Sequence, residues 1–400
     1  TGVERAKMLN RYIFPFKSAD KDIGSYLKKI KKKGNLKTTT DKKVLNNVEV
    51  VIISLGLDLK KNLTDFKSKN FLNAINDIGN NIKEDTLIVV QSTVPIGFTK
   101  RFIYPILKRC FKKRKLDYNN ILLAHSYERV TPGAKFLNSI KNSSRVYSGI
   151  NDISKIKCKY FLKKFINYKQ FPLTELKNTV ESELSKILEN SYRAVNIAFI
   201  DEWRQFSEFL NLDLERIIQA IRLRKTHANI MMPGLGVGGY CLTKDPLFAE
   251  LSAKKIFKKN IKFKFSSSSV LTNEQMLKSN IRKIKKIIKN KKIKKNKVLI
   301  FGLSYKADVD DLRHSPALSL AVSLRKNKQK VYFFDSFIKK DVMGIKKLKN
   351  LSKINNFDII IFAVNHENFK KVNFNNLKIN RGTTVYDANL VLTNKQESIL

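Results

Sequence analysis

The sequence is poor in cysteine and has no long apolar run, and both shortages exclude classes of protein. Its three cysteines, Cys110, Cys158 and Cys241, stand far apart and show no metal-ligand spacing. This pattern argues against a disulfide framework and against a structural zinc site, and it favours a reducing, cytoplasmic compartment. No apolar run approaches the ~20 residues that a membrane span needs. We therefore expect a soluble protein with no metal ion and no membrane partner.

Acidic residues are too scarce to balance the basic ones. The chain has 79 Lys and Arg against 34 Asp and Glu, so its formal net charge is +45. Such an excess is typical of nucleic-acid-binding proteins, because clustered cations release counterions from phosphate. Here the lysines are spread along the whole chain, which indicates a compositional bias, and we expect no nucleic-acid partner. The densest run, 282–297, is predicted as a lysine-rich helix end and linker, with binding to nucleic acid or to an anionic surface left open as the alternative.

Apolar runs and helical patterns predict an α/β fold in three parts. We expect two Rossmann-like parallel-sheet domains, the first one truncated, joined by a central region of long helices. A helix from about 174 to 210 contains no proline or glycine and indicates a spine between the domains. The predicted domains are 1–170, 171–285 and 286–400. The predicted strands are 48–55, 86–91, 121–124, an edge strand at 145–149, 298–301, 331–334, 358–364 and 384–386.

The most informative motif is the loop 233–246, which places several glycines ahead of one cysteine and an aspartate four residues after it. The glycines are Gly234, Gly236, Gly238 and Gly239. They remove the Cβ barrier to positive φ and let backbone approach a ligand closely. Cys241 is then a candidate nucleophile beside the carboxylate of Asp245. The alternative is a cysteine that packs as a small hydrophobic residue.

Polar residues elsewhere form weaker signals. Lys186 and Asn190 lie one turn apart on the long predicted helix, where they point together into a site or belong to a solvated stripe. Ser92 and Thr93 follow one predicted strand, and Glu128 follows the next. Ligands of open α/β sheets bind at such strand ends, so these residues are candidates for a binding site. For Glu128 the usual alternative is a carboxylate on the protein surface.

The last α/β part carries its own motif after the strand 298–301. Lys306 and Arg313 are suitable partners for phosphate groups. They are followed by Ser315 and Pro316, a pair that predicts the start of a helix.

In order and spacing, these motifs resemble the UDP-glucose/GDP-mannose dehydrogenase family. The resemblance rests on Ser-Thr-Val-Pro-Ile-Gly at 92–97, the Lys186 and Asn190 helix, the cysteine loop, and Gly-Leu-Ser-Tyr-Lys through Arg-His-Ser-Pro at 302–316. It spans nearly the whole chain. It implies an NAD-dependent enzyme of polysaccharide biosynthesis that oxidises the C6 alcohol of a UDP-sugar to a carboxylate, using two NAD and a cysteine-bound intermediate. It also implies a homodimer formed through the central helices.

The resemblance assigns roles residue by residue. Cys241 would capture the C6 aldehyde, and the resulting thioester would release the uronate to water. Lys186 and Asn190 would stabilise the oxyanion. The remaining roles are a water held by Asp245 and Thr93, thioester hydrolysis aided by Glu128, substrate binding by Gly234, Gly236, Gly238, Gly239 and Lys306, and cofactor binding by Ser92, Thr93 and Arg313.

Two features leave alternatives open. The family begins with a strand and a Gly-x-Gly-x-x-Gly turn for the NAD pyrophosphate, and no such turn precedes residue 48. We therefore expect a truncated chain that binds NAD poorly or not at all, the alternative being a non-catalytic relative that only binds nucleotide sugar. The run 128–133 resembles members that act on UDP-N-acetylhexosamines, whereas Gly-Gly-Tyr-Cys-Leu resembles UDP-glucose enzymes, and the sequence leaves both substrates open.

Overall fold

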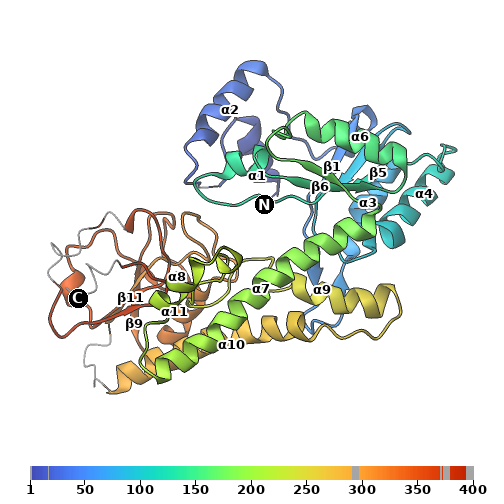
Figure 1. The fold of residues 1–400 in the computed structure, drawn as a ribbon. Coiled ribbons are helices and arrows are strands. Elements are labelled where there is room, and N and C mark those ends of the chain that lie inside the picture. Colours follow the sequence, from blue (N-terminus) through green and yellow to red (C-terminus); the bar gives the residue numbers. More distant parts are fainter. Residues whose placement is uncertain (1, 17, 291–296, 370–371, 373–378, 393–400) are drawn as a thin grey trace. The chain divides into compact units, whose positions relative to one another are not determined.

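The computed structural model describes residues 2–16, 18–290, 297–369, 372 and 379–392 (Figure 1). The chain divides into two compact units, each assembled from separate segments. The first comprises Thr1–Phe16, Asp20–Ser191 and Lys244–Lys264, and the second comprises Lys17–Ala19, Tyr192–Thr243 and Phe265–Leu400. Each unit contains one five-stranded sheet.

The sheet of the first unit has the order β1-β4-β5-β6-β7. Its strands are β1 (Val50–Ile53), β4 (Leu87–Val90), β5 (Leu123–His125), β6 (Arg145–Gly149) and β7 (Leu173–Glu175). β1, β4 and β5 are parallel, whereas β6 runs antiparallel to β5 and parallel to β7. A two-stranded antiparallel ribbon of β2 (Asp58–Leu59) and β3 (Phe66–Lys67) follows β1. The carboxyl ends of β1, β4 and β5 therefore lie along one edge.

Helices cover both faces of this sheet, and the inner strand β4 is buried along its whole length. Ile88 and Val90 face the core shared with α3 (Lys69–Asn81) and α4 (Tyr104–Lys113). Leu87 and Val89 face the smaller core under α6 (Asp152–Lys163). The alternation of β4 side chains between two apolar cores explains why its sequence is a continuous apolar run.

The sheet of the second unit is parallel throughout and has the order β10-β9-β8-β11-β12. Its strands are β8 (Lys297–Phe301), β9 (Lys330–Phe334), β10 (Lys346–Lys347), β11 (Ile359–Phe362) and β12 (Thr384–Asp387). The helix α11 (Pro316–Lys326) packs on it, and the Oγ of Ser315 accepts a hydrogen bond from the N–H of Leu318 at its first turn. The predicted start of this helix is confirmed.

Two long helices dominate the middle of the chain. α7 (Thr179–Phe209) begins in the first unit and continues into the second, and α10 (Lys264–Asn290) follows the cysteine loop. Within the second unit they lie side by side (Figure 1), joined by a hydrogen bond of 3.1 Å from the Asn273 side chain to the carbonyl of Ala194. The remaining helices are α1 (Gly2–Asn10), α2 (Asp22–Lys33), α5 (Phe136–Lys141), α8 (Leu214–Arg222) and α9 (Asp245–Leu251). In the part of the chain that the structure describes, no helix is both long enough and apolar enough to span a membrane.

The predicted α/β class is confirmed, but the start of the long helix and the edge of the first sheet were predicted wrongly. Residues Leu173–Glu175 form β7 and not the start of a helix, so β6 has neighbours on both sides and is not the edge strand. After the cysteine loop, α9 passes at Ser252–Ile256 into a wider, π-type turn, so the chain stays helical from Asp245 to Ile256. α10 extends to Asn290, and the rest of the predicted basic linker lies mainly outside the described residues. The three-domain division stays a prediction.

Neighbouring strands offer a matched test of this packing. Ile88→Ala in β4 removes a side chain that is fully buried, whereas Ile52→Ala in β1 removes one that is 46% exposed. We expect Ile88→Ala to lower the free energy of unfolding by about 2–5 kcal/mol, because a cavity remains in the core. Ile52→Ala should lower the free energy of unfolding by well under half as much, because its side chain is partly in solvent already. Urea denaturation of both variants measures the difference, and equal losses would contradict the assignment of β4 as an inner strand buried on both faces.

Candidate active site

In the second unit, the cysteine loop packs tightly against the segment that follows β8. A Cβ on Gly238 would lie 2.7 Å from the Cδ of Pro316, and one on Gly239, whose φ is +81°, would lie 2.8 Å from the ring of Tyr305. Glycine is therefore required here for contact with the protein's own chain, in addition to any ligand. Cys241 follows as an exposed residue. No disulfide joins the cysteines among the described residues.

A pocket of about 210 Å³ lies beside this loop, at the carboxyl ends of β8, β11 and β12. It brings together Gly236 and Lys306, both predicted to bind substrate. Burial lowers the pKa of Lys306, and the nearby Arg193 guanidinium acts in the same direction, while Asp308 opposes them. The other lining residues are Ser304, Tyr305, Ala307, Pro316, Ala317, Ala363, Val364, Asn365 and Asn389. Ligands of open α/β sheets bind at this edge.

Two asparagines that the sequence analysis missed hold the glycine loop in place. The buried side chain of Asn280 donates to the carbonyl of Leu235 at 3.1 Å and accepts from the hydroxyl of Tyr386 at 2.8 Å. The N–H of Leu235 in turn donates to the side chain of Asn389 at 3.0 Å. Both asparagines are far from the loop in sequence, so no local pattern could have identified them.

Arg313, the predicted cofactor ligand, is paired within its own segment. Its Nε lies 3.0 Å from both carboxylate oxygens of Asp311, and its Nη2 lies 2.6 Å from Oδ2. This hydrogen bonding raises the pKa of Arg313. Arg313 belongs to the second unit, whereas Ser92 and Thr93 belong to the first. Its role in cofactor binding stays a prediction.

In the first unit, the structure brings Lys186, Asn190 and Asp245 together around one buried carboxylate. Asp245 begins α9, and its side chain is fully buried. The Nδ2 of Asn190 donates to Oδ2 at 2.7 Å, and the Nζ of Lys244 lies 2.6 Å from Oδ1. Burial raises the pKa of Asp245, while the Lys244 and Lys186 cations pull it back down. The sequence analysis missed Lys244, although its position immediately before Asp245 was a signal.

Lys186 also contacts the segment that follows β5. Its Nζ donates to the backbone carbonyl of Glu128 at 3.2 Å and lies 5.1 Å from the centre of the Tyr127 ring. The carboxylate of Glu128 accepts a hydrogen bond from the N–H of Val130. Glu128 and Lys186 therefore meet through the Glu128 backbone, and the Glu128 side chain turns towards its own loop.

The Ser92 and Thr93 segment is fixed to the sheet and to helix α7. The N–H and Oγ of Ser92 both donate to the carbonyl of Ile53, at 3.0 and 3.2 Å. Farther along, the fully buried carboxyl of Glu183 accepts from the N–H groups of Gly97 at 2.5 Å and Thr99 at 2.8 Å. Glu183 was missed by the sequence analysis, yet it lies one turn before Lys186 on α7. It holds the segment that carries Thr93 against the helix that carries Lys186.

Neutral polar side chains lie at the strand ends of the first unit. Ser92 follows β4, Thr93 is half-buried beside it, and His125 ends β5. Burial lowers the pKa of His125 to about 3, so its ring is neutral and bonds through Nδ1 to the hydroxyl of Ser182 at 2.7 Å. Hydroxyl groups and a neutral sheet edge fit the ribose and amide groups of a dinucleotide, and the edge is the one at which such ligands bind.

Comparison with known proteins places these features in a family. Residues 3–165 match the model of the UDP-glucose/GDP-mannose dehydrogenase NAD binding domain, 180–275 the central domain and 299–394 the UDP binding domain. A UDP-N-acetyl-D-mannosamine dehydrogenase from Methanocaldococcus jannaschii is 31% identical over 370 residues, which cover 91% of this chain and 78% of that protein. The chain belongs to the UDP-glucose/GDP-mannose dehydrogenase family.

Other members of the UDP-glucose/GDP-mannose dehydrogenase family agree in sequence and fold. The UDP-N-acetyl-D-mannosamine dehydrogenase of Campylobacter jejuni is 28% identical, over 73% of this chain and 71% of that protein. The solved Pyrococcus horikoshii enzyme superimposes with a TM-score of 0.82 at 25% identity, over 98% of this chain and 88% of that one. The solved UDP-N-acetyl-mannosamine dehydrogenase of Staphylococcus aureus superimposes with a TM-score of 0.83 at 24% identity, over 99% of this chain and 89% of that one.

These matches confirm the predicted family and fold, and the cofactor is NAD. The chain is that of an NAD-dependent nucleotide-sugar dehydrogenase with a UDP binding domain. The match of 180–275 contains Lys186, Asn190, Cys241 and Asp245, and the match of 299–394 contains Lys306 and Arg313. The individual roles of these residues stay predictions.

The buried carboxyl of Glu183 gives a test through pH. Burial raises its pKa from 4.5 to about 8, against the opposing effect of the hydrogen bonds from Thr99 and Gly97. Between these values the unfolded chain loses the proton and the folded chain keeps it, so the contribution of Glu183 to stability is complete below pH 4.5 and falls as the pH rises to 8. We expect the wild type to lose up to about 4 kcal/mol of stability relative to Glu183→Gln from pH 5 to pH 8.

Urea denaturation of both proteins at the two pH values measures this change. Glu202→Gln, which removes an exposed carboxylate from the same helix, serves as the control. A difference between wild type and Glu183→Gln that stays constant with pH would show that the carboxyl keeps the same proton occupancy in both states.

Proposed function

We propose that the protein is a UDP-N-acetylhexosamine 6-dehydrogenase that oxidises the C6 alcohol of its substrate to a carboxylate. The observation that carries the proposal is the cluster of Lys186, Asn190 and the buried Asp245, in a family of NAD-dependent nucleotide-sugar dehydrogenases. The acetamido sugar is favoured over UDP-glucose because relatives in several organisms are UDP-N-acetyl-D-mannosamine dehydrogenases. The run 128–133 supports the same choice.

Cys241 is the proposed nucleophile for the second oxidation. The first oxidation converts the C6 alcohol to an aldehyde, and the Cys241 thiolate adds to it, forming a C–S bond and a thiohemiacetal. Loss of hydride from this carbon leaves a thioester, and attack by water then breaks the C–S bond and returns the thiol. NAD, when bound, supplies the hydride acceptor for both oxidations. Cys241 is exposed, so a sugar aldehyde can reach its thiol.

Residues of the first unit would stabilise charge and move protons. A negative oxygen develops when the thiolate or water adds to the carbonyl carbon, and the Lys186 ammonium and the Asn190 amide are the proposed donors to it. Asp245, with its pKa raised by burial, and Thr93 would hold the water that carries the proton of the C6 alcohol. Glu128 would assist the water that hydrolyses the thioester.

Lys306 and the glycine loop would bind the nucleotide sugar. The pocket beside Gly236 lies in the segment that matches the UDP binding domain and its neighbouring loop. Lys306 is half-buried and close to Arg193, and an anionic diphosphate would relieve the repulsion between these cations. Gly234, Gly238 and Gly239 would shape the same loop around the sugar.

Replacement of the nucleophile tests the covalent route. We expect Cys241→Ala to reduce uronate formation at least ~10³-fold, because no thioester forms without the thiol. Cys158→Ala, which removes a buried thiol in α6, should keep the wild-type rate in folded protein. The measurement is NADH release together with mass spectrometry of the sugar product. Robust uronate formation by Cys241→Ala would contradict the proposal.

A substrate panel tests the choice of sugar. We expect the highest kcat/KM with UDP-N-acetyl-D-mannosamine, followed by UDP-N-acetylglucosamine, UDP-glucose and GDP-mannose, measured as NADH production. A preference for UDP-glucose would overturn the acetamido assignment and leave the reaction intact. Binding of UDP-sugars with no NADH from any of them would instead support the non-catalytic alternative.

A cytoplasmic location and the absence of a nucleic-acid partner stay predictions from composition.

We also propose a homodimer formed through the central helices. In the second unit, Phe199, Trp203 and Phe206 are about half exposed along α7, and their rings form a continuous edge-to-face row. Their spacing of four and three residues places them on one side of the helix. Exposed apolar rows of this kind mark protein–protein interfaces, and in a two-fold dimer the same face of each copy meets its counterpart.

Charge reversal on this helix tests the dimer. Light scattering after size exclusion should give a dimer for the wild type and a monomer for Trp203→Glu, because a carboxylate would be buried without a partner at the interface. Glu202→Lys changes an exposed neighbour on α7 and should leave the dimer intact. A monomeric wild type, or a dimeric Trp203→Glu, would contradict the proposed interface.

A further inference from the structure

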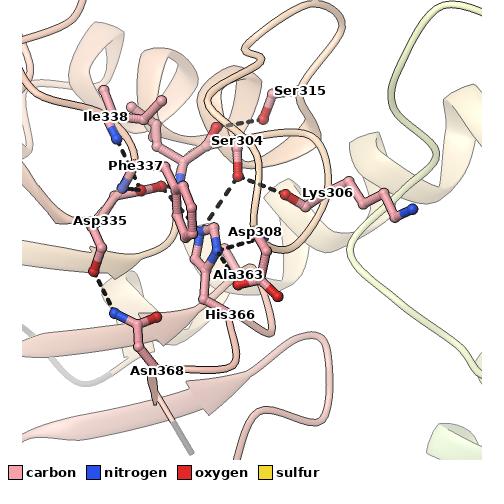
Figure 2. A network of polar contacts seen from close by, with 12 residues as sticks. Ser304, Lys306, Asp308, Ser315, Asp335, Phe337, Ile338, Ala363, His366 and Asn368 are labelled. Atoms are coloured by element: carbon pink, nitrogen blue, oxygen red, sulfur yellow. Dashed lines mark hydrogen bonds and ion pairs between the residues drawn. The ribbon is translucent and has the colours of Figure 1, made fainter. Parts of the chain in front are cut away.

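In the second unit, three loops that follow parallel strands meet around the buried ring of His366 (Figure 2). The N–H of Asp308 donates to Nδ1 at 2.9 Å, so Nδ1 is the acceptor and Nε2 carries the proton of the neutral ring. Nε2 faces the Oδ2 of Asp335 at 3.3 Å and the hydroxyl of Ser304 at 3.4 Å. His366 therefore joins the loop after β8 to the loops after β9 and β11.

Asp335 continues this connection with its whole carboxylate. Oδ2 accepts from the N–H of Leu303 at 2.8 Å, and Oδ1 accepts from the N–H groups of Phe337 at 2.7 Å and Ile338 at 3.1 Å. Burial acts to raise the pKa of Asp335, but the His366 ring and these N–H groups outweigh it and hold the pKa below its usual value. A buried carboxylate with this many donors fixes the backbone of both loops.

The segment 303–308, fixed at both ends by these two side chains, carries Lys306. Inside it, the hydroxyl of Ser304 donates to the carbonyl of Lys306 at 2.8 Å, and Asp308 adopts a φ of +60°. Figure 2 shows the Lys306 side chain extending away from the His366 network, and Lys306 lines the pocket described above. The His366 ring itself cannot turn easily, because it stacks on Phe337 with centroids 5.1 Å apart.

We propose that Asp335 and His366 are positioning residues of the nucleotide-sugar site, which hold the backbone of 303–308 so that Lys306 faces the pocket. The inference rests on the proposed function of that pocket. The critical contact is the bond from the Asp308 N–H to Nδ1. It closes the segment after Lys306 in the same way that Asp335 closes it before Lys306.

Two replacements of His366 separate positioning from stability. Asn places an acceptor where Nδ1 stands, whereas Gln places a donor where Nε2 stands, and each loses the other contact and the ring. We expect His366→Asn to keep the dissociation constant for UDP within ~3-fold of wild type, and His366→Gln to raise it ~10-fold or more, because the Asp308 N–H is left unpaired. Isothermal titration with UDP measures both values. The KM for the UDP-sugar should follow the same order, with kcat unchanged.

Further variants keep the test decisive if the His366 variants do not fold. Asp335→Asn replaces one carboxylate oxygen with an NH₂ group, which cannot accept a hydrogen bond from the backbone N–H groups that face it. We expect UDP binding to weaken ~10-fold. Ser304→Ala removes the hydroxyl that donates to the Lys306 carbonyl and faces Nε2 of His366, and we expect ~3-fold weaker binding of UDP. Ile300→Val lowers stability from the core of β8 without touching the segment, and its UDP affinity should equal that of the wild type.

The outcomes distinguish this inference from the function on which it rests. Near-wild-type UDP affinity in His366→Asn together with weakened affinity in His366→Gln supports the positioning role. If the ring only stabilised the fold, its loss would weaken UDP binding equally in both variants. Wild-type affinity in His366→Gln, Asp335→Asn and Ser304→Ala would overturn the positioning role while the pocket assignment stands. A wild-type protein that does not bind UDP would overturn the pocket assignment and this inference together.

Discussion

A buried carboxylate is costly unless donors surround it, and the loops of both units depend on this constraint. Glu183 gathers the N–H groups of 97–99, Asp245 gathers the Asn190 amide and the Lys244 ammonium, and Asp335 gathers three N–H groups and the His366 ring. Each group permits few arrangements of its neighbours, because any arrangement that withdraws a donor leaves a buried carboxyl oxygen without a hydrogen bond. These hydrogen bonds add to the apolar packing of the same loops, in which Val94, Phe98 and Leu303 are buried in the cores.

The sequence predicted what local periodicity encodes. The apolar runs identified the long buried strands such as β4 and β8, whose side chains face apolar cores on both sides. It could not predict β7, because Leu173–Glu175 is short and mostly exposed and becomes a strand only by pairing with β6. For the same reason, the sequence predicted β6 as the edge strand of the first sheet, whereas β7 lies beyond it.

The candidate site divides in a similar way. The loop around Cys241 and Asp245 has a motif that can be recognised in sequence, and so do Lys186 and Asn190. Glu183, Asn280 and His366 have none, since each acts on a segment at least 45 residues away in the chain: Glu183 contacts Thr99 across 84 residues, Asn280 contacts Leu235 across 45, and His366 contacts Asp308 across 58. A single charged or polar residue in an otherwise ordinary helix or loop carries no local signal of such a partner.

The helix α11 begins at the pocket, where Pro316 and Ala317 form part of the lining. Its aligned peptide dipoles give that end a partial positive charge of about half a unit. Unlike the Lys306 ammonium, whose pKa is already lowered by burial, this charge takes up and releases no proton and has no side chain to mutate. The pocket would therefore keep a basal attraction for anions in alkaline solution, and even with Lys306 removed, for as long as the helix itself remains folded.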